Sequence, residues 1–204
     1  MTARRWLAAA AAMTMVSPAA AEDMPPAGRV DMAALRDFGA CMVERYRDDA
    51  VQAVEGDFRD EEHADAQRRF AERHARCLGA SGGELRTSGV LFAGAMAEAL
   101  LREDLTQEQL RDSLRPVDPP LEARSDTEYV GLCMALKHPA ETAALVYSDP
   151  AKAEGDTQVT AYAENLPQCV QQGQQLRINK PGLRAIATLA AYRIAAARRA
   201  GEES

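Results

Sequence analysis

The chain contains the sequence GACMVERYRDDAVQAVEGDFRDEEHADAQRRFAERHARC at residues 39–77 and a related one, GLCMALKHPAETAALVYSDPAKAEGDTQVTAYAENLPQC, at residues 131–169. The two sequences align without a gap at an offset of 92 positions. Each copy has a cysteine at its third position and another at its last, 36 positions further on. Because both cysteines recur together with their neighbours, we interpret the chain as a tandem duplication of one unit.

The match continues beyond the second cysteine of each copy with one-residue slips. Leu85-Arg86 corresponds to Leu176-Arg177 and Gly89-Val90 to Gly182-Leu183, and an Ala-rich segment follows in both copies. Two copies are too few for a solenoid, which needs three or more. We therefore predict a pseudo-symmetric pair of units.

The sequence pattern indicates helices throughout. Leu35, Phe38, Met42 and Tyr46 recur at intervals of three or four positions, which places them on one face of a helix. No segment alternates apolar and polar residues for long enough to indicate a strand. Only 5% of the residues are aromatic, which favours close-packed helices over a β-sandwich. The predicted fold class is all-α, with two tandem pseudo-symmetric disulfide-stapled helical units.

Capping residues and prolines predict where the helices begin and end. His138-Pro139 lies over Tyr46-Arg47, and because proline disfavours helix at the preceding residue, we expect a break there in both copies. Thr106 and Gln109 form a capping box that starts a short helix. Asp31 is the expected N-cap of the first helix and Ser88 that of the helix at 89–102. The expected helices cover about 31–46, 48–55, a third ending near the second cysteine of each copy, 89–102, 106–115, 140–147 and 181–199, with Gly201 as a stop signal.

The N-terminal residues have the three parts of a secretory signal. Arg4 and Arg5 form a positive n-region, residues 6–16 form a largely apolar h-region, and cleavage is expected between Ala21 and Glu22. An apolar segment of this length is shorter than the roughly 20 residues that a membrane-spanning helix needs. The expected organisation is a signal peptide (1–21), a flexible lead-in (22–30), helical repeat unit 1 (31–115), a Pro-rich linker (116–125), helical repeat unit 2 (126–199) and a frayed tail (200–204).

Composition bears on the compartment and on the partners. The preference for Arg over Lys is typical of a high-GC bacterium, so we expect export to the periplasm or the medium. The formal net charge is -7, and it becomes -9 when the two arginines of the signal are removed (-7 - 2). An acidic chain repels phosphate backbones. We expect an unknown protein or small ligand as the partner, no nucleic acid, and no stable membrane insertion after signal removal.

Four cysteines permit three disulfide pairings. An exported protein meets an oxidising environment, in which thiols form disulfides. The repeat favours Cys41–Cys77 and Cys133–Cys169, because each copy then closes its own loop. The rival interpretation is thiol redox chemistry, which typically uses a C-x-x-C pair that this chain lacks.

Two motifs suggest chemistry, and each has a simpler interpretation. Gly79-Ala80-Ser81-Gly82-Gly83 matches the G-x-S-x-G nucleophile elbow of hydrolases, but that motif needs a strand before it, and a helix is predicted there. His74 and Cys77 form an H-x-x-C pair with His63 upstream, but zinc sites need closely spaced ligand pairs, and the second copy lacks both histidines. We therefore assign no catalytic, cofactor-binding or metal-ligating residue and expect no cofactor.

Charged residues that recur in both copies are candidates for structural ion pairs. Glu72 recurs as Glu164, and Arg86 as Arg177, so an acid near an aromatic residue could pair with the arginine of the same copy. Paired catalytic carboxylates, which need tuned pKa values, are the less favoured interpretation.

The order G-x-C-M, helix, Cys, Leu-Arg, Gly and Ala-rich helix resembles small exported proteins of alphaproteobacteria, especially sphingomonad-like ones, with tandem Cys-containing helical repeats. The resemblance covers roughly residues 37–102 and 129–195. It implies export and a repeated helical unit, and it implies no activity, so no functional residue is carried over from it.

The function that we expect is that of a non-enzymatic binding or interaction module. A groove between the two units is the expected site, because pockets favour interfaces between domains or helices. The alternatives are a small envelope hydrolase that uses Glu72 and Glu164, and an inhibitor or stress-protective envelope factor.

Overall fold

The structure, a computed structural model, describes residues 31–57, 60–78, 88–171 and 176–202. Within these residues the only regular elements are helices, which confirms the predicted all-α class. The predicted signal peptide, the lead-in and the Gly79–Gly83 motif lie outside the described residues. The elements are α1 (Met32–Glu55), α2 (Glu61–Arg73), the 3₁₀ turn η1 (Ala75–Leu78), α3 (Gly89–Asp104), α4 (Gln107–Ser113), α5 (Asp126–Lys137), α6 (Pro139–Tyr147), α7 (Ala153–Ala163), the 3₁₀ turn η2 (Leu166–Gln168) and α8 (Lys180–Glu202).

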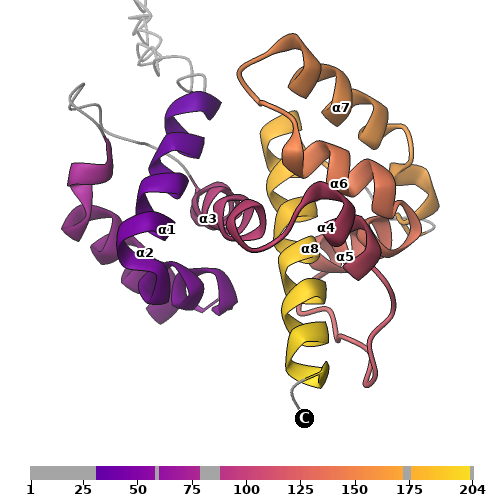
Figure 1. The fold of residues 1–204 in the computed structure, drawn as a ribbon, viewed down its shortest axis with the longest axis horizontal. Helices are drawn as coiled ribbons and strands as arrows, with labels where there is room; N and C mark the ends of the chain where they lie inside the picture. The colour runs from indigo at the N-terminus through magenta and orange to yellow at the C-terminus, as the bar shows by residue number, and fades with distance from the viewer. Residues whose placement is uncertain (1–30, 58–59, 79–87, 172–175, 203–204) are drawn as a thin grey trace, which may run out of the picture.

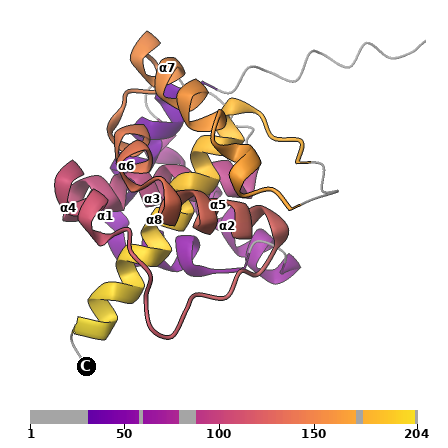
Figure 2. The same ribbon diagram turned by 90° about the vertical axis from the view of Figure 1, so that its right-hand side faces the viewer.

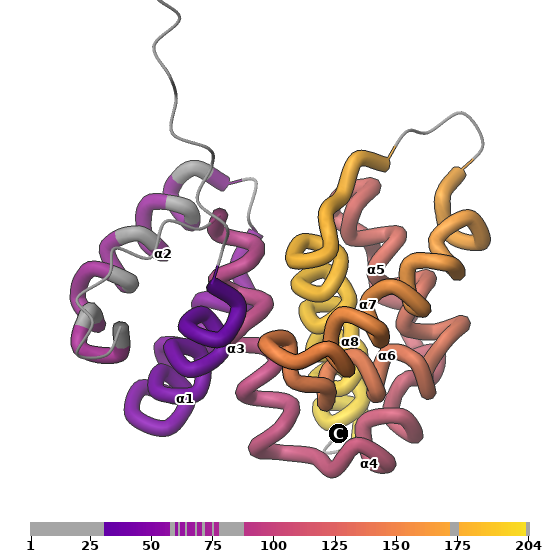
Figure 3. The backbone as a smooth tube through the Cα atoms, turned by 90° about the horizontal axis from the view of Figure 1, so that it is seen from above, coloured from indigo at the N-terminus to yellow at the C-terminus, as the bar shows by residue number. Residues whose placement is uncertain are grey.

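Helices α3 and α8 pack against each other at the centre of the molecule (Figure 1, Figure 3). Helices α1 and α2 cover one side of this pair, and α5, α6 and α7 cover the other. Figure 2 shows α8 running through the middle of the molecule, with its C-terminal end far from α7. The Ala-rich helix of each copy, α3 or α8, therefore lies inside, and the helices before it lie outside.

Small residues allow α3 to approach its neighbours on two sides. A Cβ atom placed on Gly39 of α1 would lie 2.5 Å from the carbonyl oxygen of Ala95, and one placed on Gly94 would lie 2.7 Å from the Cβ atom of Ala185 on α8. Nearly every residue from Leu91 to Leu101 is buried. A helix that is apolar on all sides is stable only in the interior, so α3 becomes the centre of the fold.

The two copies form the same succession of elements. The helix breaks at Tyr46, where φ and ψ are -142° and 47°, and at His138, where they are -127° and 57°, as the proline argument predicts. Helix α7 begins 92 positions after α2 (153 - 61), and a 3₁₀ turn follows each of them. Asp31, Ser88 and the Thr106 capping box start their helices as predicted.

The structure corrects three expectations about where the elements end and correspond. Helix α2 ends at Arg73, so Cys77 lies in the 3₁₀ turn and not at a helix end. Helix α8 continues through Gly201 to Glu202, so Gly201 does not stop it, and a Cβ atom placed on Gly201 would meet nothing within 4 Å. Gly39 and Gly131 are equivalent positions, and a Cβ atom on Gly39 would meet Ala95 whereas one on Gly131 would meet Ile186. Helices α3 and α8 therefore correspond at an offset of 91 (186 - 95), and not at the offset of 93 that pairs Gly89 with Gly182.

One hydrophobic core joins the two predicted units. It contains Phe38 and Met42 of α1, Val146 of α6 and Ile194 of α8, all buried. Helix α4, which has no counterpart in the second copy, packs mainly on α6 and α8 of the other unit. The two units therefore share their interior.

Candidate functional site

A pocket of about 320 Å³ opens between the two units. The end of α1 and the start of α3 form one wall, and the start of α5 and the middle of α8 form the other. Its volume lies at the lower end of the range of about 300–1,000 Å³ that is usual for small-molecule sites. The pocket occupies the place where a groove between the units was expected.

The inner wall of the pocket is apolar. Val54, Ile186 and Ala190 are buried, whereas Val90 and Leu189 are half-buried. These five side chains come from α1, α3 and α8, so the wall exists only when the two units are packed together.

The rim of the pocket carries a network of charged groups around Glu128. The Arg124 Nη2 donates to Glu128 Oε1 at 2.8 Å, and the Arg124 backbone N–H donates to Oε2 at 2.6 Å. From α8, Arg193 Nη1 also donates to Glu128 Oε1. Arg124 Nη1 donates to the carbonyl oxygens of Glu55 and Gly56 at 3.1 and 3.0 Å, so it satisfies acceptors that the end of α1 leaves unpaired.

The Glu128 carboxyl group is held in its ionised form. Burial raises its pKa, but the hydrogen bonds from Arg124 and the charge of Arg193 outweigh burial, so the pKa lies below its ordinary value. The rim therefore presents two guanidinium groups that share one carboxylate.

A second network of charged groups lies inside the molecule, between α3 and α8. Arg184 Nε and Nη2 donate to the two oxygens of Glu98 at 2.9 and 3.0 Å, a bidentate pair, and both side chains are about 5% exposed. Arg184 also donates to Ser148 Oγ at 3.0 Å and to the Ser148 carbonyl oxygen at 2.7 Å. Its position holds α3, α8 and the end of α6 together.

Arg102 completes this inner network. Its Nη2 lies 3.1 Å from Glu98 Oε1 and donates at 2.8 Å to the carbonyl oxygens of Val146 and Ser148. The guanidinium carbon lies 5.5 Å from the centre of the Tyr147 ring. The last carbonyl groups of α6 thus accept from two arginines. The space beside Arg184 is about 10 Å³, and a wider one of about 360 Å³ lies beside Glu98 and Arg102.

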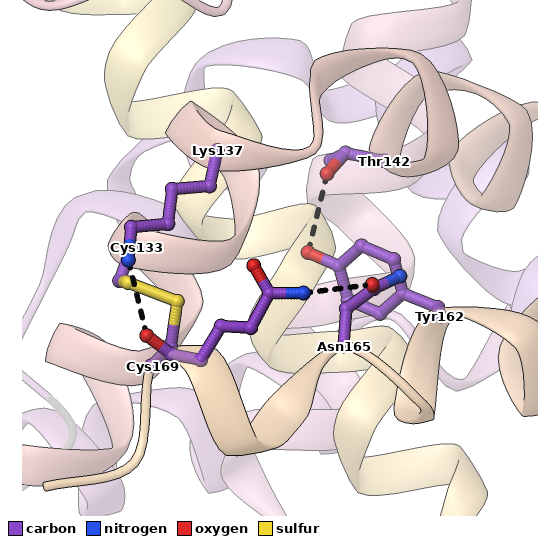
Figure 4. The surroundings of a disulfide bond; sticks show 7 residues. Cys133, Lys137, Thr142, Tyr162, Asn165 and Cys169 are labelled. Atoms are coloured by element: carbon purple, nitrogen blue, oxygen red, sulfur yellow. Dashed lines mark hydrogen bonds between the residues drawn. A yellow bond between two sulfur atoms is a disulfide. The ribbon is translucent and has the colours of Figure 1, made fainter.

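The disulfides Cys41–Cys77 and Cys133–Cys169 are both formed, which confirms the predicted pairing. Their Cα–Cα distances are 5.6 and 5.7 Å. In Figure 4 the second bond joins α5 to the residue after η2, and Lys137 Nζ donates to the Gln168 carbonyl oxygen at 3.1 Å beside it. The first bond ties α1 to η1, and the second ties α5 to the residue after η2. Both bonds therefore have a structural role.

The buried aromatic residue of the second copy lies close to this disulfide. Thr142 Oγ1 donates to the Tyr162 hydroxyl at 3.2 Å, and both residues are buried (Figure 4). Burial raises the pKa of Tyr162. The matching residue Phe70 contacts Phe92, so both copies place an aromatic ring in the core here.

The structure does not form the predicted pair between Glu164 and Arg177. Both side chains are exposed, and within the described residues they make no ion pair with each other, because Glu164 lies at the exposed end of α7. Glu72 is exposed on α2, and its predicted partner Arg86 lies outside the described residues. The buried ion pair that sequence analysis sought is Glu98–Arg184.

Glu72 and Glu164 were also considered as a pair of catalytic carboxylates. Helices α2 and α7 lie on opposite sides of the α3–α8 pair (Figure 1, Figure 3), so Glu72 and Glu164 are not brought together as paired acids. His74 is buried between Tyr46 and Phe70, with ring-centre distances of 4.0 and 4.8 Å. Cys77 forms a disulfide with Cys41. Among the described residues no group of three or more His, Cys, Asp or Glu could hold a metal ion.

The comparisons with known proteins found no family model, curated protein or solved structure that matches this chain. Among the described helices, none is both long and apolar enough to cross a membrane.

Sequence analysis missed the charged residues of both networks. Glu98 is the one charged residue between Gly89 and Leu101, and Arg184 interrupts an Ala-rich helix, so an isolated charge in an apolar helix was the available signal. Arg193 carries the same signal, because it is the only charged residue in the Ala-rich stretch 188–197, whereas Arg124 and Glu128 lie in a mixed polar sequence.

Proposed function

We propose that the protein is an exported, non-enzymatic binding module whose site is the pocket between its two units. The observation that carries this proposal is a space of about 320 Å³ that combines an apolar inner wall with a charged rim. Such sites bind small molecules through the apolar wall and orient them through a few polar groups. The exposed, separated positions of Glu72 and Glu164 give the hydrolase alternative no support.

Export rests on the signal-like residues 1–21, with cleavage between Ala21 and Glu22, and on the resemblance to exported repeat proteins. The two disulfides support an oxidising compartment, such as the periplasm or the medium. In that compartment a binding module would meet small molecules directly.

Titration with the neutral dye N-phenylnaphthylamine tests the pocket in the purified, oxidised protein. Fluorescence should rise with saturation at one dye per chain. Leu189→Trp should abolish this rise, because the half-buried Leu189 faces the pocket and an indole ring there would fill it. Leu136→Trp is the matched control, since Leu136 is also half-buried on a helix but does not line the pocket.

Unchanged dye binding by Leu189→Trp would place the site elsewhere and contradict the proposal. A signal in the parent protein that never saturates would also contradict it. Circular dichroism of both variants shows whether each has kept its helices.

A further inference from the structure

The charged rim indicates which molecules the pocket would select. Arg124 and Arg193 share the single carboxylate of Glu128, and Asp57, the other acid on the wall, has an interaction of its own. We propose that the pocket binds a small amphiphile with one carboxylate, whose alkyl part lies against the apolar wall and whose carboxylate is bound by Arg193. This inference rests on the proposed function and names the ligand class of the same site.

Arg193, and not Arg124, has donors to spare. Arg124 directs Nε and Nη2 to Glu128 and Nη1 to the two carbonyl oxygens at the end of α1. Arg193 uses Nη1 for Glu128, and its contacts with the Glu122 carbonyl oxygen are long, at 3.4 Å. Within the described residues its Nε makes no hydrogen bond, so a ligand carboxylate can accept from it without displacing Glu128.

The position of Arg193 on α8 aligns the two parts of the site. Leu189 and Ala190 lie one turn before it on the same helix and belong to the apolar wall. A ligand that places its carboxylate at Arg193 therefore extends its alkyl chain along α8 towards Ile186. The Arg193 side chain is only 21% exposed, so water competes weakly for its donors.

Electrostatics separate this class from the alternatives. The lining carries two acids, Glu128 and Asp57, beside its two arginines, so selection depends on the spare donors of Arg193 and not on net charge. A cation cannot accept from these donors, and a neutral amphiphile accepts from them more weakly than a carboxylate does. A hydrogen bond between charged groups is stronger than one to a neutral group, and a tenfold change in affinity corresponds to about 1.4 kcal/mol. The carboxylate should therefore bind about tenfold more tightly than its neutral counterpart.

Competition against N-phenylnaphthylamine tests the inference in the purified, oxidised protein. The competitors are octanoate, octanol and octylamine, which share one alkyl chain and carry a negative, no and a positive charge at neutral pH. We expect octanoate to displace the dye at a concentration about tenfold lower than octanol, and octylamine to be the weakest. Equal displacement by octanoate and octanol, or stronger displacement by octylamine, would overturn the inference and leave the pocket itself standing.

Variants of the rim assign the effect to one residue. Arg193→Gln should remove the advantage of octanoate over octanol, and Arg193→Lys should keep most of it. Arg198→Gln is the matched control, because Arg198 lies on the same helix, pairs with Glu202 and does not line the pocket. An advantage that survives in Arg193→Gln would overturn the role of Arg193. A protein that never binds the dye would contradict the proposed function instead.

Discussion

Among the residues whose burial the structure describes, Glu98 and Arg184 are the only buried Asp, Glu, Lys or Arg. Their bidentate pair joins α3 to α8, and Arg184 also donates to the end of α6. Two buried charges stabilise a fold only when each keeps its partner, because a lone charge in the interior is far more costly than the pair. The joint between the two units therefore depends on both residues.

Replacing one member of this pair should destabilise the protein strongly. Arg184→Met leaves Glu98 buried without its main partner, and the free energy of unfolding should fall by about 3–5 kcal/mol. The double variant Glu98→Leu/Arg184→Met should recover most of this loss, since Arg102 still donates to the carbonyl groups of α6. Urea unfolding measures both.

Arg177→Met is the control for this prediction, because Arg177 is exposed. Its effect should stay within about 0.5 kcal/mol. A loss below about 1 kcal/mol in Arg184→Met would show that the pair does not hold the units together.

Asp149 makes the stability depend on pH in acid. The hydrogen bond from the Ala151 N–H and then that from Arg36 lower the pKa of Asp149 to about 2. A carboxyl group with a lowered pKa stabilises the folded state above its unfolded pKa, near 4, and this contribution disappears as the pH falls towards 2. Asp149→Asn should therefore be less stable than the parent at neutral pH, and the difference should vanish towards about pH 2.

Urea unfolding of the parent and of Asp149→Asn over this pH range tests the claim. Asp48→Asn is the control, since Asp48 is exposed and makes no ion pair with the described residues. A stability difference that stays constant down to about pH 2 would contradict the role of Asp149.

At the scale of helices, the close approach of α3 and α8 sets the architecture. Gly94 of α3 faces Ala185 of α8 where the two helices cross. These residues are equivalent positions of the two copies, at the offset of 91 (185 - 94). Two small residues at the contact let the backbones approach more closely than larger side chains would allow. The contact is therefore sensitive to a single methyl group.

Gly94→Ala should lower the stability, against the usual preference for alanine in helices. The added Cβ atom would lie 2.7 Å from the Cβ and 2.8 Å from the Cα of Ala185, so the helices would have to separate, at a cost of about 1–3 kcal/mol. The Cβ atom added by Gly201→Ala would meet nothing within 4 Å, so this variant should be neutral or stabilising by up to about 1 kcal/mol. Thermal unfolding of both variants compares them, and equal or higher stability of Gly94→Ala would refute the close contact.

At the scale of the whole molecule, the two copies share one hydrophobic core. The core cluster takes residues from α1, α3, α5, α6 and α8, and α4 crosses from its own copy to the other. Each disulfide, in contrast, lies within one copy. The disulfides therefore stabilise the copies locally, while the core makes their unfolding cooperative.

Removing one disulfide should lower the stability without separating the unfolding of the two halves. The double variant Cys41→Ala/Cys77→Ala should lose about 2–5 kcal/mol and still unfold in one transition. Calorimetry and circular dichroism measure this, with Cys133→Ala/Cys169→Ala as the matched variant of the second copy. Two resolved transitions in either variant would show that the copies unfold independently.

Predictions from sequence succeeded where the signal was local or was repeated. The caps at Asp31, Ser88 and Thr106 depend on side chains that bond within three positions of themselves. The break at Tyr46 was predicted from a proline in the other copy. Recurrence in both copies does not say whether a side chain is buried, and Glu164 and Arg177 are both exposed.

The sequence by itself determined the helices, their caps and the disulfide pairing, since each depends on neighbouring residues or on a comparison of the two copies. The tertiary structure alone decided the shared core, the Glu98–Arg184 pair and the pocket. Glu98 and Arg184 lie 86 positions apart, and the rim of the pocket joins residues 65 or more positions apart. Such contacts depend on how α3 crosses α8, and the packing of small side chains, not local propensity, sets that crossing.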